Sequence, residues 1–184
     1  MTGDWLLPGA KQDGQTVDAE WRHVGRPRIA GVEIKEVRHV PTGYGWLTEV
    51  WRRDWGVDAL PVDQVFQSTL GPGGLSAWHA HAETTDRLFV NQGMMRIVLY
   101  DARRDSPTFG TVQETQLGAL RPGLVLVPPR VWHGVQNVHP APSSVLNLVD
   151  RAYRYQGPDH WRLPPDSPEI PYRFTTRVAS SELW

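Results

Sequence analysis

Residues 73–93, which read GGLSAWHAHAETTDRLFVNQG, decide the fold. Two histidines, His79 and His81, are separated by one residue, and Asp86 follows after four more. On a β-strand, residues i and i+2 face the same side. Both imidazoles can therefore face the interior of a barrel, and Asp86 can return on the paired strand after a tight loop. The stretch predicts two paired strands that direct ionisable side chains into one pocket.

A second segment, residues 128–137 (PPRVWHGVQN), follows about forty residues later. We expect it to form a neighbouring strand that directs His133 into the same pocket. Together the two segments resemble the paired motifs of cupin barrels. Three departures are visible: Asp86 stands where glutamate is usual, Arg130 replaces a glycine, and Gly123 lies one position from the expected leading glycine. The resemblance implies an all-β, cupin-type double-stranded β-helix (jelly-roll) barrel.

The rest of the chain has the same β rhythm. Short segments with alternating apolar residues are separated by turns rich in Gly and Pro. They lie at 32–37, 46–52, 63–70, 75–81, 87–91, 95–100, 111–117, 124–127, 131–137 and 144–149. We find no long helix, dinucleotide-binding glycine motif, phosphate loop or nucleophile elbow. We expect an extended or poorly ordered arm at 1–28, a barrel with a C-terminal wrap at 29–174 and a tail at 175–184.

Composition narrows the possible partners. The chain has 184 residues, the size of one domain, and 19 basic residues against 20 acidic ones. Without a basic excess, nucleic acid and anionic membrane surfaces are not expected partners. No apolar run approaches the roughly 20 residues that span a bilayer, and the N-terminus does not resemble a secretory signal. We therefore expect a cytoplasmic protein.

The histidine cluster allows two chemistries. Three imidazoles, His79, His81 and His133, with the carboxylate of Asp86, suit Fe, Mn, Ni, Zn or Co. Because the chain has no cysteine, a metal would depend on such ligands. The same inward positions also serve acid/base chemistry without a metal, in which a histidine is the base. The sequence leaves both possibilities open, so no cofactor is predicted with certainty.

Three further stretches resemble the dTDP-4-dehydrorhamnose 3,5-epimerase (RmlC-like) family. They are residues 99–110 (LYDARRDSPTFG), 127–134 (VPPRVWHG) and 162–170 (RLPPDSPEI). The resemblance implies a homodimeric sugar epimerase or isomerase that removes a proton next to the carbonyl of a keto-sugar or nucleotide-sugar. His79 matches the family's catalytic base, and Asp166 is the best match for the aspartate that orients it. Arg87, Arg130, His133 and Asn147 are the candidate substrate contacts.

Other family positions are changed. The two arginines that hold the nucleotide diphosphate fall near Tyr44 and Ser76, and the catalytic tyrosine falls near Leu146 or Asn147. The family's lysine and glutamine positions fall at Asp86 and His81, which are also candidate metal ligands. We therefore predict weak binding of dTDP-sugars. Two alternatives to an epimerase remain: a metal-dependent cupin acting as a dioxygenase, isomerase or lyase, and a non-catalytic sugar-binding barrel.

Overall fold

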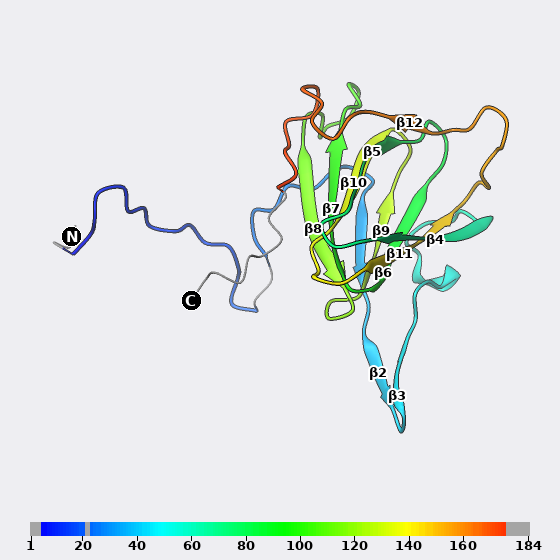
Figure 1. Cartoon of the computed structure of the whole chain (residues 1–184), viewed down its shortest axis with the longest axis horizontal. Helices are drawn as coiled ribbons and strands as arrows, with labels where there is room; N and C mark the ends of the chain where they lie inside the picture. The colour runs from blue at the N-terminus through cyan, green and yellow to red at the C-terminus, as the bar shows by residue number, and fades with distance from the viewer. Residues whose placement is uncertain (1–4, 21–22, 176–184) are drawn as a thin grey trace.

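The computed structural model describes residues 5–20 and 23–175, and it contains two five-stranded antiparallel sheets (Figure 1). The first sheet has the order β1 (Glu33–Glu36), β9 (Gly123–Val127), β6 (Asp86–Gln92), β11 (Ser143–Val149) and β4 (Gln64–Leu70). The second has the order β12 (Trp161–Arg162), β5 (Leu75–Ala80), β10 (Val131–Asn137), β7 (Met94–Asp101) and β8 (Val112–Gly118). The predicted all-β jelly-roll class is confirmed.

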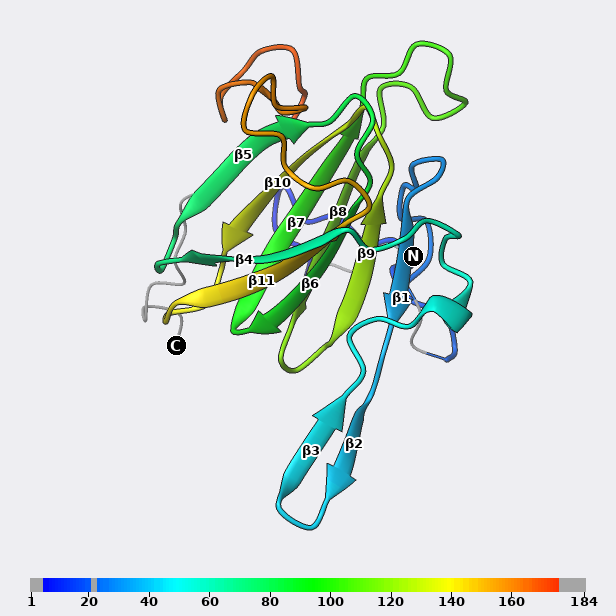
Figure 2. The same ribbon diagram turned by 90° about the vertical axis from the view of Figure 1, so that its right-hand side faces the viewer.

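A separate hairpin projects away from the sheets (Figure 2). It consists of β2 (His39–Thr42) and β3 (Gly45–Thr48), and a short 3-10 helix, η1 (Arg53–Trp55), follows it. The predicted strand segments at 32–37 and 46–52 leave a gap in which the structure has β2, with Pro41 inside it. An exposed two-stranded edge tolerates proline since no ladder bond is needed on its outer side. Within the described residues, no helix is long and apolar enough to cross a bilayer.

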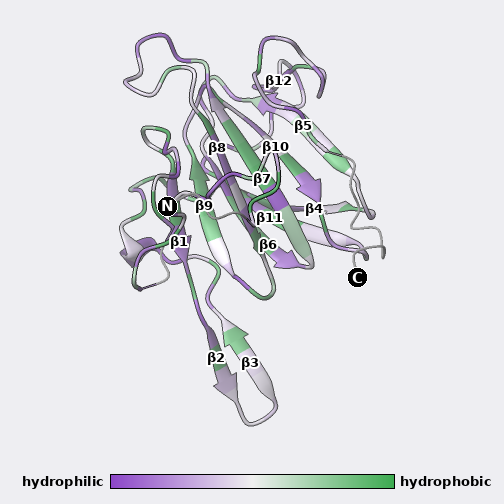
Figure 3. Ribbon diagram, turned by 90° about the vertical axis from the view of Figure 1, so that its left-hand side faces the viewer, coloured by the Kyte–Doolittle hydropathy of each residue, from purple (hydrophilic) through white to green (hydrophobic). Residues whose placement is uncertain are grey.

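The core lies between the sheets, where alternate residues of the strands face inward. The strands of the sheets contain hydrophobic stretches, which are green in Figure 3. The buried residues of this core include Leu88, Val90, Ile97, Leu99, Val125 and Val131. Trp78 lies on the opposite face of β5, as strand alternation requires, and it is fully buried under Tyr172 and Phe174. The C-terminal segment therefore covers the outer face of the second sheet. Most of the predicted tail lies outside the described residues.

The segment with the strongest family resemblance, residues 99–110, is structural. Asp101 is fully buried, and its carboxylate accepts hydrogen bonds from Arg103 Nε (2.8 Å), Ser106 Oγ (2.6 Å) and Thr108 Oγ1 (2.7 Å). Although burial opposes the shift, these donors hold the pKa of Asp101 well below its usual range. The motif fixes the turn between β7 and β8, and its residues do not line the pocket described below.

Candidate active site

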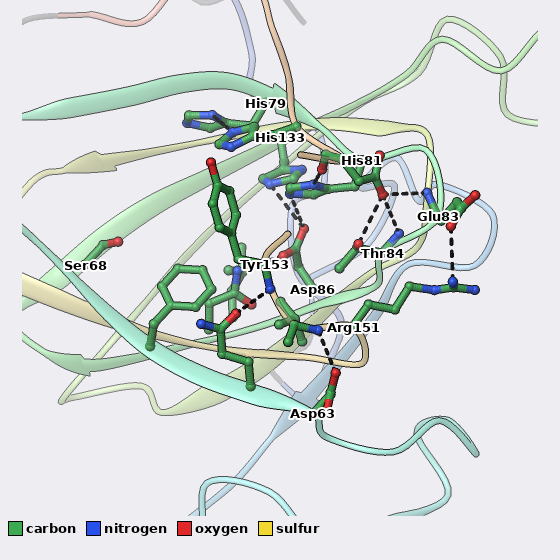
Figure 4. A pocket seen from close by; sticks show the side chains of 18 of the residues that line it. Asp63, Ser68, His79, His81, Glu83, Thr84, Asp86, His133, Arg151 and Tyr153 are labelled. Atoms are coloured by element: carbon green, nitrogen blue, oxygen red, sulfur yellow. Dashed lines mark hydrogen bonds and ion pairs between the residues drawn. The ribbon is translucent and has the colours of Figure 1, made fainter. Parts of the chain in front are cut away.

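A cavity of about 550 Å³ lies between the sheets (Figure 4). Its walls are inward-facing residues of β4, β5, β6, β10 and β11, and the segment that follows β11 covers one side. His79, His81, Asp86, His133 and Asn147 all line it, as the sequence predicts for a shared pocket. His79 and His133 come from the adjacent strands β5 and β10, whereas Asp86 and Asn147 come from the adjacent strands β6 and β11 of the facing sheet. The predicted pairing of the His79 strand with the Asp86 strand is therefore wrong, because the two strands belong to different sheets and face the cavity from opposite sides.

Three of these groups converge on one point. His81 Nε2 lies 3.3 Å and His133 Nε2 lies 3.4 Å from Asp86 Oδ2. Asn147 Nδ2 donates a 2.7 Å hydrogen bond to the other carboxylate oxygen of Asp86. The carboxylate is almost completely buried, at 1% exposure, so its orientation is fixed by these neighbours.

His79 is held by different partners. Its Nδ1 lies 3.0 Å from His160 Nε2, and its Nε2 lies 2.8 Å from Ser76 Oγ. The structure does not place the predicted partner, Asp166, beside His79. Asp166 is exposed, in a turn after β12, and does not line the pocket. The family-like segment at 162–170 therefore supplies no carboxylate here, and His160, which precedes it, occupies the orienting position.

Asp159 fixes the segment that delivers His160. Its carboxylate accepts hydrogen bonds from the backbone amides of Ala82, Glu83 and Thr84, at 2.7 to 3.1 Å, and from the Thr84 hydroxyl. Its carbonyl oxygen contacts His81 Nδ1. Although burial opposes the shift, the amide donors lower the pKa of Asp159 to about 2. One anchored dipeptide, 159–160, thus contacts both His79 and His81.

The electrostatics of the pocket favour neutral imidazoles. Burial, followed by the nearby charges of His133 and Arg162, lowers the pKa of His79 to about 3. Burial is also the main cause of the lowered pKa values of His133 and His160. A neutral imidazole has a free lone pair, so His79 is in the form that accepts a proton at neutral pH.

Arg87 is not a substrate contact, contrary to the sequence prediction. Its side chain is fully buried on the face of β6 opposite to Asp86, where its guanidinium forms two hydrogen bonds with the carboxylate of Asp58, at 2.6 and 2.7 Å. It also donates to the backbone carbonyls of Leu60 and Leu148. The period of two explains the difference, since adjacent strand residues face opposite sides.

Arg130 also lies outside the pocket lining. It is exposed in the turn before β10, and its backbone φ of 65° is in the left-handed region that favours glycine. Glycine, which the resembled cupin motif has at this position, adopts this conformation without strain. Arg130, a predicted substrate contact, therefore does not face the cavity.

We expect the Arg130→Gly variant to be more stable than the wild type by up to about 1 kcal/mol, because glycine adopts a positive φ without a Cβ clash. Urea unfolding followed by tryptophan fluorescence measures the change. Turnover should be unaffected. A variant with an unchanged fold that lost substrate affinity would instead place Arg130 in the binding site.

Several lining residues were missed by the sequence analysis. Tyr153, Arg151, Arg154 and Arg162 all belong to the irregular segment after β11 or to β12. In Figure 4 the Tyr153 phenol points across the cavity toward His79. No alternation or motif marks residues 151–154, and the family-like stretch that begins at Arg162 gives no sign that Arg162 faces the pocket, so only the fold reveals these positions.

Comparison with known proteins gives consistent results. The dTDP-4-dehydrorhamnose 3,5-epimerase family profile matches residues 26–182. A probable low-salt glycan biosynthesis epimerase of Haloferax volcanii is 31% identical over 76% of this chain and 90% of its own. A spore coat polysaccharide biosynthesis protein of Bacillus subtilis is 30% identical over 80% of this chain and 97% of its own.

A solved structure is similar as well. The crystal structure of a dTDP sugar isomerase from Desulfovibrio desulfuricans superimposes with a TM-score of 0.73 at 31% identity, covering 78% of this chain and 90% of the other. A 3'-monoepimerase from Streptomyces bikiniensis in complex with dTDP-quinovose, at 19% identity and a TM-score of 0.71, shares the fold.

Proposed function

The chain belongs to the dTDP-4-dehydrorhamnose 3,5-epimerase family, and from this premise we propose that it epimerises a keto-sugar by removing a proton from the carbon next to the carbonyl. The observation that carries the proposal is His79: a neutral, oriented imidazole in a cavity large enough for a sugar. Proton transfer of this kind requires a positioned base and a positioned acid.

The base is assigned to His79 Nε2. In the tautomer that fits its contacts, His79 Nδ1–H donates to His160 Nε2, and the lone pair of Nε2 accepts from the Ser76 hydroxyl. Substrate displaces the Ser76 contact, and Nε2 takes the proton from the carbon. The electron pair of the broken C–H bond moves into the carbonyl to give an enolate. His160 acts as the orienting group because it fixes the tautomer of His79.

The acid is assigned to Tyr153. Its phenol points toward His79 from the opposite side of the cavity, so a sugar ring between them has one face toward each group (Figure 4). Return of a proton from Tyr153 to the second face inverts the carbon and restores the carbonyl. Tyr153 is thereby left as a phenolate and His79 as an imidazolium, and both reset by exchange with solvent.

The substrate is assigned to the nucleotide-linked keto-sugars. Related proteins are described as dTDP-sugar enzymes and include complexes with dTDP. Tyr44, at the position of one expected arginine, is 96% exposed on the projecting hairpin. Arg151, Arg154 and Arg162 line the pocket instead, and guanidinium groups bind phosphate oxygens well. Arg151 also pairs with Glu83 at 3.1 Å. We expect these arginines to hold the diphosphate in place of the two missing ones, which would replace the predicted weak dTDP-sugar binding by micromolar affinity.

The test is incubation of the purified protein with a dTDP-4-keto-6-deoxyhexose in D₂O, followed by NMR. Deuterium should enter the carbon next to the ketone, and a new epimer should appear. Titration with dTDP separates binding from chemistry. Micromolar affinity supports the nucleotide-linked class, whereas no binding at millimolar concentration together with turnover of a free keto-sugar would exclude it.

We expect Tyr153→Phe to separate the two halves of the reaction. Deuterium exchange on the face next to His79 should continue, while formation of the inverted product should fall by about 10²–10⁴-fold, the usual contribution of a general acid. Tyr155→Phe is the matched control, since Tyr155 is 92% exposed and does not line the pocket. Equal loss of exchange and inversion in Tyr153→Phe would contradict the assignment.

We also propose that the protein is a homodimer joined through the β2–β3 hairpin. Val40, Trp46 and Leu47 expose 55%, 69% and 55% of their surfaces on this hairpin, and such patches mark interaction sites. Trp46→Ser should shift the protein toward monomer in light scattering coupled to size exclusion. A wild-type protein that is monomeric at all concentrations would disprove the homodimer.

A further inference from the structure

The separations around Asp86 differ from those of hydrogen-bonded ion pairs. Charge-assisted N–H···O contacts are about 2.7–2.9 Å long, but the two imidazoles lie 3.3 and 3.4 Å from Asp86 Oδ2. Ligand atoms about 2.0–2.1 Å from one ion are about 2.9 Å apart at neighbouring positions of an octahedron and about 3.3–3.4 Å apart in a tetrahedron. The ligand atoms of His81, Asp86 and His133 all lie within 4.8 Å of one another.

In each of these side chains, the polar atom that faces away from the shared point has a hydrogen-bond partner, as is usual for metal ligands. His81 Nδ1 contacts the carbonyl of Asp159, and His133 Nδ1 lies 3.2 Å from the carbonyl of Val131. Asp86 Oδ1 accepts from Asn147. A backbone carbonyl that accepts from Nδ1–H leaves Nε2 unprotonated. Each of the three groups therefore presents a lone pair to the same point.

We propose that His81 Nε2, Asp86 Oδ2 and His133 Nε2 bind one divalent first-row transition ion, with its remaining positions open to the cavity. Two imidazoles and a carboxylate form a ligand set that suits such ions. Both nitrogens of His79 have other partners, so the site has three protein ligands and not the four that the sequence allows.

The position of the proposed ion site beside His79 indicates what a bound ion would do in the reaction. Asp86 and both imidazoles line the same cavity as His79. A cation held there would polarise the substrate carbonyl and stabilise the enolate oxygen, as a Lewis acid does. This role rests on the proposed epimerisation, whereas ion binding itself does not.

The test uses Co²⁺ as the probe. The full-length protein is stripped with dipicolinate and titrated with Co²⁺, and visible d–d absorption and calorimetry follow binding. We expect one Co²⁺ per chain, displaced by Zn²⁺. His81→Gln and Asp86→Asn should lower the affinity at least 10-fold. His139→Ala, a change in the turn outside the pocket, should not.

Circular dichroism of each variant shows whether it is folded, and two independent ligand variants protect the test against failure of one to fold. His79→Ala should bind Co²⁺ normally although it lacks the proposed base. Saturable Co²⁺ binding by a wild-type protein that shows no deuterium exchange would therefore refute the epimerase and not the site. Absence of saturable Co²⁺ binding by the wild type, or equal binding by folded His81→Gln and Asp86→Asn, would overturn the site.

Discussion

Replacing His79 with alanine is expected to lower solvent deuterium exchange into a keto-sugar nucleotide by about 10²–10⁴-fold. The reason is that Nε2 is the proton acceptor assigned to that side of the pocket. The contacts of Nε2 with Ser76 and of Nδ1 with His160 orient the ring for this purpose. Because the lost group acts mainly in the transition state, kcat should fall far more than affinity. NMR in D₂O measures the exchange.

The matched control is His139→Ala, which removes an imidazole in the turn between β10 and β11 and outside the pocket. Its exchange rate should equal that of the wild type. Circular dichroism and the melting temperature of His79→Ala establish that its fold is retained. If folded His79→Ala still exchanged deuterium at the wild-type rate, the base would have to be reassigned to another pocket residue.

Arg87→Ala is expected to lower the free energy of unfolding by about 3–5 kcal/mol, the cost of breaking a buried ion pair. The change leaves the Asp58 carboxylate, which is largely buried, without its bidentate partner, and it removes donors from the carbonyls of Leu60 and Leu148. Urea denaturation measures the loss. Below the melting temperature, KM for substrate should be unchanged because Arg87 does not line the cavity.

Arg52→Ala is the control for the effect of losing an arginine. The ion pairs of Arg52 with Glu49 and Asp54 lie at the surface, so this variant should keep nearly the same denaturant midpoint. A folded Arg87→Ala with normal stability and a raised KM would restore the sequence-based assignment of Arg87 to substrate binding.

Asp86 and Arg87, which are neighbours in β6, show what could be predicted from the sequence: Asp86 lines the pocket as expected, and Arg87 does not. Alternation placed His79, His81 and His133 around one pocket, and it required Arg87 to face away once Asp86 faced inward. The prediction of Arg87 as a substrate contact conflicts with that rule, because Arg87 directly follows Asp86 on the same strand. The periodic strands were therefore predictable from a local rule, and Arg87 was predictable as well.

The segment after β11 was not predictable in the same way. His160 and Tyr153 lie on irregular backbone with neither a helical nor a strand period, and the matching family stretch directed attention to Asp166 instead. Their positions depend on tertiary contacts such as those of the Asp159 carboxylate with the amides of residues 82–84. No local property of the sequence encodes those contacts.

This anchoring has a consequence for biosynthesis. The Asp159 clamp and the His160 contact join residues 75 to 81 positions apart in the chain, and domains assemble as the ribosome adds about 5–20 residues per second. The strands that carry His79 and His133 are complete before residue 159 is made. A nascent chain that ends within β11 therefore has His79 and His133 but still lacks His160, the proposed orienting partner of the base.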